Sequence, residues 1–129
     1  MFQSLNISRL IIILVLLGLF FSCTGSKRYF KAAEKLEKQG LVNEAAEFYL
    51  ESLKRNYKNT QARIKLKEVG QKYVDFLSSQ FFREFSTNDY NSAIQTFEKI
   101  LDFKERSSAL GVELSYPTAY KDDYETAID

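Results

Sequence analysis

The chain has 129 residues, enough for a single domain, and it carries 18 Lys and Arg against 17 Asp and Glu, which argues against nucleic acid as the main partner. It contains no histidine and one cysteine, so composition excludes a His-dependent nucleophile, a His-ligated metal, a cysteine metal cluster and an intramolecular disulfide. We therefore expect a protein that is not an enzyme and has no metal, no cofactor and no small-molecule substrate.

The N-terminus has the parts of a secretion signal. An uncharged, almost wholly apolar run from Leu10 to Phe21 follows a positively charged start, and the small residue Ser22 comes before Cys23. A membrane-spanning helix needs about 20 apolar residues, so this run is short for a permanent anchor. The pattern predicts a signal peptide over residues 1–22. The alternative is a signal-anchor that stays in place, extended through Ile7.

The sequence Phe20-Phe21-Ser22-Cys23 resembles the lipobox of bacterial lipoproteins, with phenylalanine at position 20 where that family prefers leucine. The resemblance implies cleavage before Cys23, a diacylglycerol on its thiol and an acyl chain on its new amine, which together give a stable membrane anchor. Thr24 replaces the aspartate of inner-membrane lipoproteins, which favours the outer membrane. Residues 23–28 are polar and predict a flexible tether. Because this tether is basic, we expect the protein to face the periplasm.

Apolar residues then recur at helical spacing. A first helix ends near Gly40, and a second helix begins near Asn43. A long helix is expected from about Thr60, which is a suitable N-cap, to Phe85, and Gly70 is a point where it could kink or split. Its core face is predicted by near-heptad spacing of Ile64, Leu66, Val69, Tyr73, Phe76, Leu77, Phe81 and Phe85.

Two segments share a turn-and-helix pattern: Gly40-x-Val42-x-x-Ala45-x-x-x-Tyr49 and Asn88-x-Tyr90-x-x-Ala93-x-x-x-Phe97. The pattern resembles the tetratricopeptide repeat. The two alanines are 48 residues apart (93 − 45), against about 34 in that repeat, and the excess of 14 is close to four helical turns. The resemblance implies an all-α fold over residues 29–104, a fragment of an α-solenoid made of helical hairpins with one elongated helix.

Residues 105–129 predict a C-terminal loop and a short helix. The stretch from Arg106 to Gly111 is loop-like, and Val112 to Tyr116 alternates as an extended segment does. Pro117 is suited to the first turn of a last helix, capped by Ser115 or Tyr116. We expect this helix to pack back on the bundle through Ala119, Tyr120 and Tyr124.

Two surface features are candidates for binding. The resemblance to the repeat places Phe30, Glu34, Glu37 and Lys38 on a groove-facing side, and Phe82 lies off the core face beside Phe81, where it could also line a groove. A basic segment could attract anionic lipid headgroups or an acidic partner, although a solvated helix face is the simpler explanation. Its members are Lys54, Arg55, Lys58, Arg63, Lys65, Lys67 and Lys72.

Two functions follow from these predictions. The first is a lipid-anchored helical-repeat adaptor, held in the cell envelope through its acyl anchor and binding an envelope protein or peptide. The alternative is a structural or accessory lipoprotein subunit without a peptide groove, which includes the case of a piece of a longer repeat protein. Exposed aromatic rings around Phe82 on a concave face favour the adaptor, and an open surface at the C-terminal end favours the accessory subunit.

Overall fold

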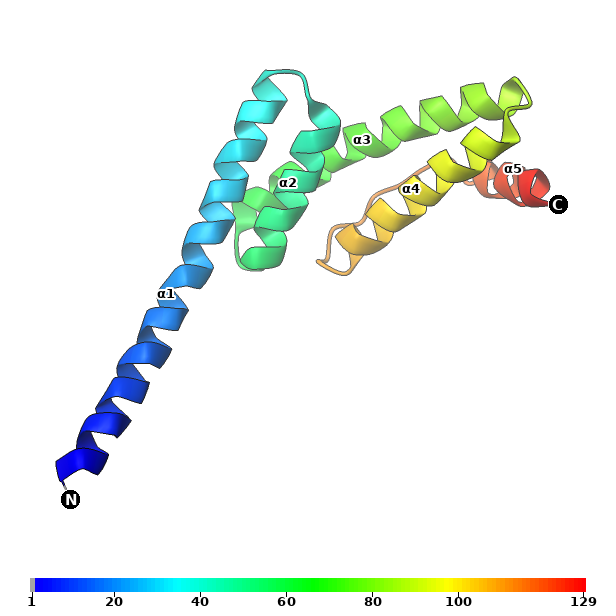
Figure 1. Ribbon diagram of the computed structural model, residues 1–129. Helices are drawn as coiled ribbons and strands as arrows, with labels where there is room; N and C mark the ends of the chain where they lie inside the picture. Colours follow the sequence, from blue (N-terminus) through cyan, green and yellow to red (C-terminus); the bar gives the residue numbers. More distant parts are fainter. Residues whose placement is uncertain (1) are drawn as a thin grey trace.

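A computed structural model describes the backbone of residues 2–129 and the side chains of residues 7–13 and 25–129. This part of the chain is all-α, as predicted, and contains five helices and no strand (Figure 1). Within the described residues, no helix has the length and apolarity that a membrane crossing needs. The helices are α1 (Phe2–Lys38), α2 (Val42–Arg55), α3 (Thr60–Ser86), α4 (Tyr90–Ser108) and α5 (Ala119–Ile128).

Helix α1 is continuous over 37 residues, and its N-terminal half projects away from the other helices (Figure 1). The expected flexible tether over residues 23–28 is therefore helical, which corrects the prediction. The reason is local packing, because Ser26 is buried against α2 and Gly25 lies beside the side chain of Arg55. Two polar residues that suggested a solvated linker are instead part of the contact between α1 and α2.

Three helices end in the same hydrogen-bonded turn. At the end of α1, Leu41 N–H donates to Leu36 O and Gly40 N–H donates to Glu37 O, the pattern of a Schellman motif. The motif recurs after α3 at Asn88 and after α4 at Gly111, and each of the three turn residues has positive φ (76°, 59° and 74°). The predicted equivalence of the Gly40 and Asn88 turns is confirmed locally, since a helix begins two residues after each.

Helix α3 is unbroken over 27 residues, as predicted. Its N-cap is Asn59, whose side chain accepts from Ala62 N–H at 3.1 Å, and not Thr60. Gly70 does not kink it. A Cβ there would lie 3.3 Å from both Leu66 Cδ1 and Phe103 Cε1, so the glycine lets α4 approach closely.

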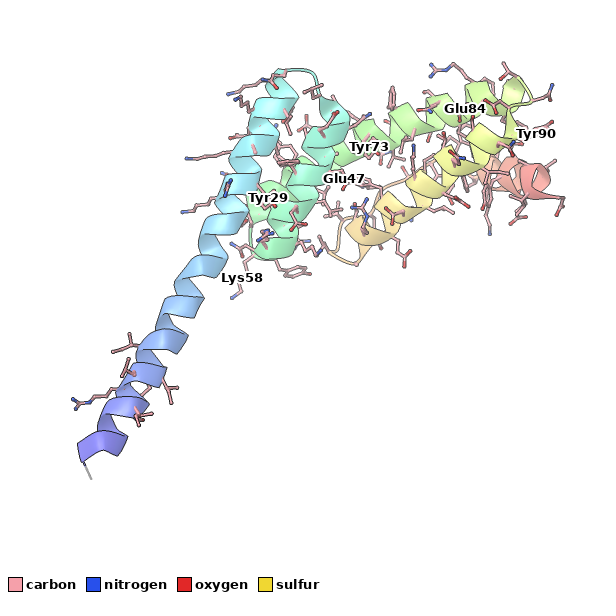
Figure 2. All side chains as sticks on the ribbon, viewed as in Figure 1. Tyr29, Glu47, Lys58, Tyr73, Glu84 and Tyr90 are labelled. Carbon is pink, nitrogen blue, oxygen red and sulfur yellow. The ribbon has the colours of Figure 1, made fainter. Side chains whose placement is uncertain are left out.

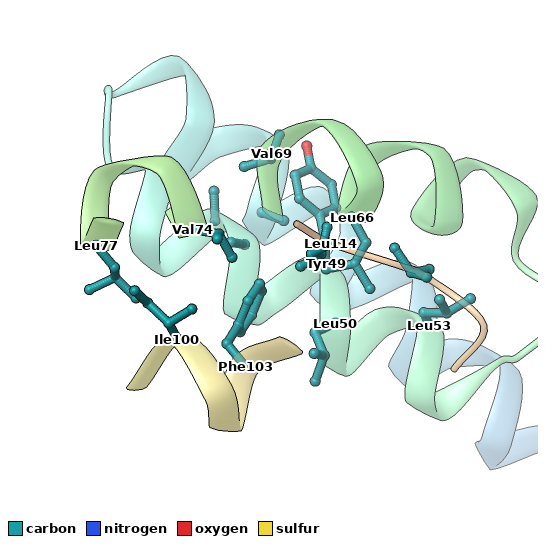
Figure 3. Packing of buried hydrophobic residues seen from close by; sticks show 14 of the residues in the cluster. Tyr49, Leu50, Leu53, Leu66, Val69, Val74, Leu77, Ile100, Phe103 and Leu114 are labelled. Atoms are coloured by element: carbon teal, nitrogen blue, oxygen red, sulfur yellow. The ribbon is translucent and has the colours of Figure 1, made fainter. Parts of the chain in front are cut away.

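The core face of α3 differs from the near-heptad prediction at two positions, since Ile64 is 61 % exposed and Phe76 is 49 % exposed. Helix α3 contacts both α2 and α4, and its buried positions move around the helix from Ala62 and Leu66 near its start to Ser78 and Phe81 near its end. The buried face therefore turns along the helix, and a single stripe does not describe it. Figure 3 shows large apolar residues of the hydrophobic core that these helices and the segment after α4 form together: Tyr49, Leu50, Leu53, Leu66, Val69, Val74, Leu77, Ile100, Phe103 and Leu114.

After α4, which continues to Ser108 where the sequence suggested a loop, the chain runs back along α3 as an extended strap over residues 110–117. Val112 and Leu114 on the strap are buried. Helix α5 follows with Thr118 as its N-cap, in place of the expected Ser115 or Tyr116.

Helix α5 covers the end of the α3–α4 pair. Its Tyr120 and Tyr124 pack on the core as predicted, whereas Ala119 is exposed. Tyr124 stacks on Phe97 of α4 with ring centroids 4.7 Å apart, and Tyr120 lies 5.2 Å from the ring of Phe81 in α3.

Candidate partner-binding groove between α1 and α3

Four of the five predicted groove residues lie on one face, where α1 runs beside the start of α3. A cavity of about 610 Å³ is lined there by Phe30 and Glu34 of α1 and by Thr60 and Gln61 of α3. A smaller cavity of about 240 Å³ continues along the helix and is lined by Glu34, Glu37, Lys38 and Lys65. Glu34 belongs to both cavities, so they form one surface, which we call the α1–α3 groove.

A hydrogen-bond network around Glu37 connects the helices beside the groove. Tyr49, fully buried on α2, donates its hydroxyl to Glu37 Oε2 at 2.7 Å, and Lys65 Nζ donates to both carboxylate oxygens at 3.1 Å. One carboxylate thus connects α1, α2 and α3. Phe30 adds an edge-on contact to the ring of Tyr49, with centroids 5.4 Å apart.

The network changes the pKa of Glu37 and of Tyr49. Burial acts to raise the pKa of Glu37, but the hydrogen bonds from Tyr49 and Lys65 outweigh it, and the pKa is lowered. Burial and the bond to Glu37 raise the pKa of Tyr49. At neutral pH Glu37 is therefore a carboxylate on the groove wall, and the phenol buried behind it stays neutral and donates to it.

The fifth predicted residue, Phe82, does not belong to this groove. It lies on the second half of α3, is 55 % exposed and stacks on Tyr120 of α5 with centroids 6.4 Å apart. Phe82 therefore contacts α5, and it does not line either cavity of the α1–α3 groove. The groove instead gains Lys65, which the sequence placed in the basic segment without assigning it a partner.

Two members of the basic segment, Arg63 and Lys67, bind the chain's own backbone. Arg63 donates to the carbonyl of Leu110, Lys67 donates to the carbonyl of Glu113, and Gln71 both donates to Ser115 O (2.8 Å) and accepts from Ser115 N–H (3.0 Å). The three side chains follow each other at four-residue spacing on α3. They hold the backbone of the strap, which no sequence signal had indicated.

A second cleft lies between α2 and α4, with a volume of about 510 Å³. Arg106 of α4 reaches across it to Glu47 of α2 with two hydrogen bonds of 2.7 and 2.8 Å, and Asp102 accepts from its Nε at 2.8 Å. The bond to Glu47 is the main reason that the pKa of Arg106 is raised. Because this bidentate pair ties the two hairpins together, we assign the cleft a structural role. Glu47 and Tyr73, which line it, are labelled in Figure 2.

The predicted lipidation site, Cys23, belongs to the stretch of α1 whose side chains lie outside the described residues. Among the described side chains, no group of three or more carboxylate, thiol or imidazole ligands is placed to hold a metal ion. Comparison of the chain with protein-family models, with curated proteins and with solved structures finds no match. The fold and the groove together define an all-α protein of packed helical hairpins with a projecting N-terminal helix.

Proposed function

We propose that this protein is a lipid-anchored adaptor of the bacterial cell envelope, with tetratricopeptide-like hairpins on the periplasmic side of the outer membrane. The lipobox-like sequence supports acylation of Cys23. The projecting part of α1 supports the signal segment that is removed when Cys23 is acylated, because its apolar side chains point to all sides and are more than half exposed. These side chains are Ile7, Leu10, Ile11, Ile12 and Ile13.

The α1–α3 groove is the surface that carries the adaptor proposal. Its single strongest observation is that Glu34 is shared by the two cavities, so Phe30, Glu34, Glu37 and Lys38 form one continuous wall. The wall faces the N-terminal part of α3. A polar, charged groove with one aromatic residue suits a segment of another protein, held by hydrogen bonds and ion pairs with Phe30 as an apolar contact.

Affinity capture of the full-length protein from membranes tests this function. The groove variant exchanges the charges of Glu34 and Lys38 (Glu34→Lys with Lys38→Glu), which keeps the net charge. The matched control exchanges Lys99 and Glu105 on the exposed side of α4 (Lys99→Glu with Glu105→Lys). We expect an envelope protein to be enriched with the wild type and the control and to be lost with the groove variant.

The outcomes separate the parts of the proposal. If no envelope protein is enriched with any form, the adaptor function is wrong. If enrichment survives the groove exchange, the partner binds elsewhere. The variant Cys23→Ser tests the anchor independently. If this variant partitions into the detergent phase to the same extent as the wild type, lipidation is ruled out.

The accessory-subunit alternative has one observation in its favour. Leu41 and Phe76, 42 % and 49 % exposed, flank a cavity of about 400 Å³ beside the turn between α1 and α2. An apolar surface of this kind suits a packed chain better than a peptide. If capture is insensitive to the groove exchange but is lost in Phe76→Ser, the accessory function is favoured over the adaptor.

A further inference from the structure

The end of the helical bundle nearest the projecting part of α1 is rich in exposed cations. The turn that joins α2 to α3 lies against α1 there, because Asn59 Nδ2 donates to Ser26 Oγ at 3.1 Å. Residues 25–31 and 51–61 together contain six Lys and Arg and a single acidic residue, Glu51. All six basic side chains are exposed: Lys27, Arg28, Lys31, Lys54, Arg55 and Lys58.

Four of these cations are free of internal ion pairs. Across the described part of the chain, the ion pairs within 4.0 Å include Lys54 and Arg55, both with Glu51, but none of Lys27, Arg28, Lys31 and Lys58. We call these last four residues the basic collar.

The collar has a definite place on the molecule. The larger cavity of the α1–α3 groove, of about 610 Å³, is lined by three collar residues, Lys27, Lys31 and Lys58. Glu34 is the one acidic residue that lines it. Figure 2 shows Lys58 beside the point where α1 leaves the bundle. Arg28 is rotated by about 100° from Lys27 on the same helix, so the collar extends around α1 and does not form a line along it.

The opposite end of the molecule is acidic. Helix α5 and Asp129 carry one lysine against four carboxylates, a net charge of −3 (1 − 4). This end lies far from the projecting helix (Figure 1). The chain as a whole has a net charge of only +1. The positive charge of the collar is therefore balanced by negative charge elsewhere in the chain, including at the α5 end, and is not a general excess of Lys and Arg.

We propose that the basic collar binds the headgroups of anionic phospholipids in the membrane that holds Cys23, and so orients the hairpins with α5 away from the surface. The inference rests on the proposed lipid anchor. Lys27 and Lys31 are about 6 and 12 Å from Cys23 along α1 at a rise of 1.5 Å per residue. Both distances are comparable to the screening length of about 8–10 Å, so the collar feels the surface charge of the bilayer.

A membrane surface fits this arrangement better than an acidic peptide does. A bilayer that holds the acyl chains of Cys23 presents negative charge around the whole end of α1, and therefore reaches Arg28 as well as Lys27. A peptide in the α1–α3 groove reaches only the cations on one side. The four collar side chains are exposed and have no carboxylate partner. They can therefore bind phosphate groups without breaking an existing ion pair.

Lysine acetylation on vesicles tests the proposal with the full-length lipidated protein. The protein is reconstituted in phosphatidylcholine vesicles with and without phosphatidylglycerol, and the acetylation rate of each lysine is measured by mass spectrometry. The anionic surface lowers the local pH and so the fraction of reactive, neutral amine. We expect acetylation of Lys27, Lys31 and Lys58 to slow by about threefold or more on the anionic vesicles. Lys99 and Lys121, which lie outside the collar, serve as internal controls and should be unaffected.

A pair of triple variants supplies the second arm. In Lys27→Gln/Lys31→Gln/Lys58→Gln, we expect the neighbouring Lys54 to lose its protection on anionic vesicles. The matched variant Lys72→Gln/Lys99→Gln/Lys121→Gln removes the same number of charges elsewhere, and Lys54 should stay protected in it. High salt should abolish the protection in the wild type, since the interaction is electrostatic.

The failures of the anchor and of the collar are distinguishable. If the wild-type protein does not float with neutral vesicles, the lipid anchor is wrong and the collar proposal falls with it. If it floats but the collar lysines react equally on both vesicles, the collar proposal alone is overturned. Protection by soluble polyglutamate with none on anionic vesicles would also overturn it and would assign the collar to an acidic protein.

Discussion

The substitution Tyr49→Phe isolates the hydrogen bond that joins α2 to the groove wall. It removes one hydroxyl from a fully buried ring and leaves the packing on Phe30 intact. A hydrogen bond to a charged acceptor contributes about 1.5–3 kcal/mol to stability. Glu37 is about a quarter exposed and keeps both bonds from Lys65, so water solvates the freed oxygen in part. We therefore expect a loss near the low end, about 1.5 kcal/mol.

Urea unfolding of the full-length protein in detergent, followed by circular dichroism, measures this loss. The midpoint should fall with no change in the denaturant slope, and the melting temperature should drop by about 6–12 °C for a domain of this size. Lys65→Met and the double variant complete a thermodynamic cycle. The losses should not add, because Tyr49 and Lys65 share one carboxylate.

The pH dependence gives an independent check of the same bond. The pKa of Glu37 is lowered in the folded state, so its contribution is complete above its ordinary value of 4.5 and is lost as the pH falls through the folded value. The gap between the wild type and Tyr49→Phe should therefore narrow below about pH 4.5. A gap under about 0.3 kcal/mol at neutral pH, or one that does not change with acid, would refute the network as the link between α1 and α2.

The remaining predictions concern the packing of the other elements. Ser52→Ala removes the 2.8 Å bond from Ser52 Oγ to the buried carbonyl of Ser26 and should destabilise by about 1–3 kcal/mol in urea unfolding. Leu114→Ala opens a void under the strap beside Gly70 and should cost about 2–5 kcal/mol, with faster proteolysis of residues 110–117. Gly40→Ala has free space around its Cβ but a φ of 76°, so backbone strain alone should lower stability by about 1–2 kcal/mol.

Matched substitutions control these three changes. Ser79→Ala lies on the exposed side of α3 and Leu101→Ala is on the partly exposed side of α4, so each should be nearly neutral. Gly40→Asn should recover much of the stability that Gly40→Ala loses, because asparagine tolerates the left-handed conformation, as Asn88 does here. Equal losses in a test variant and its control would show that the named contact is not the cause.

Sequence patterns determined the local elements well. Gly40 and Asn88 marked two helix ends because each turn needs a positive φ, which is a local requirement of the backbone. The length of α3 followed from a continuous helical period without a proline. Phe30, Glu34, Glu37 and Lys38 line adjoining cavities, and the spacing of α1 alone decides that these side chains point the same way.

Long-range packing was beyond the sequence pattern. Phe76 continues the helical spacing of the buried residues in the first part of α3. The buried positions have moved around the helix by that point, so the ring of Phe76 is exposed. The alternation of residues 112–116 indicated an extended segment, yet nothing local showed that Val112 and Leu114 would be buried. Arg63 and Lys67 looked like a solvated face for the same reason, because their acceptors are strap carbonyls 47 and 46 residues away.

The position of Phe82 bears on the choice between adaptor and accessory subunit. Its ring is exposed, but it stacks on Tyr120 at the end that α5 covers, so it gives no support to a groove there. The strap likewise occupies part of the face of α3 between Arg63 and Gln71 with the chain's own backbone, beside a cavity of about 600 Å³ lined by Ile64 and Val112. A partner segment is thereby limited to faces that the chain leaves open, and the α1–α3 groove is such a face, with a charged wall fixed by the bonds of Glu37 to Tyr49 and Lys65. This restriction, more than the aromatic cluster, is why we propose partner binding between α1 and the start of α3.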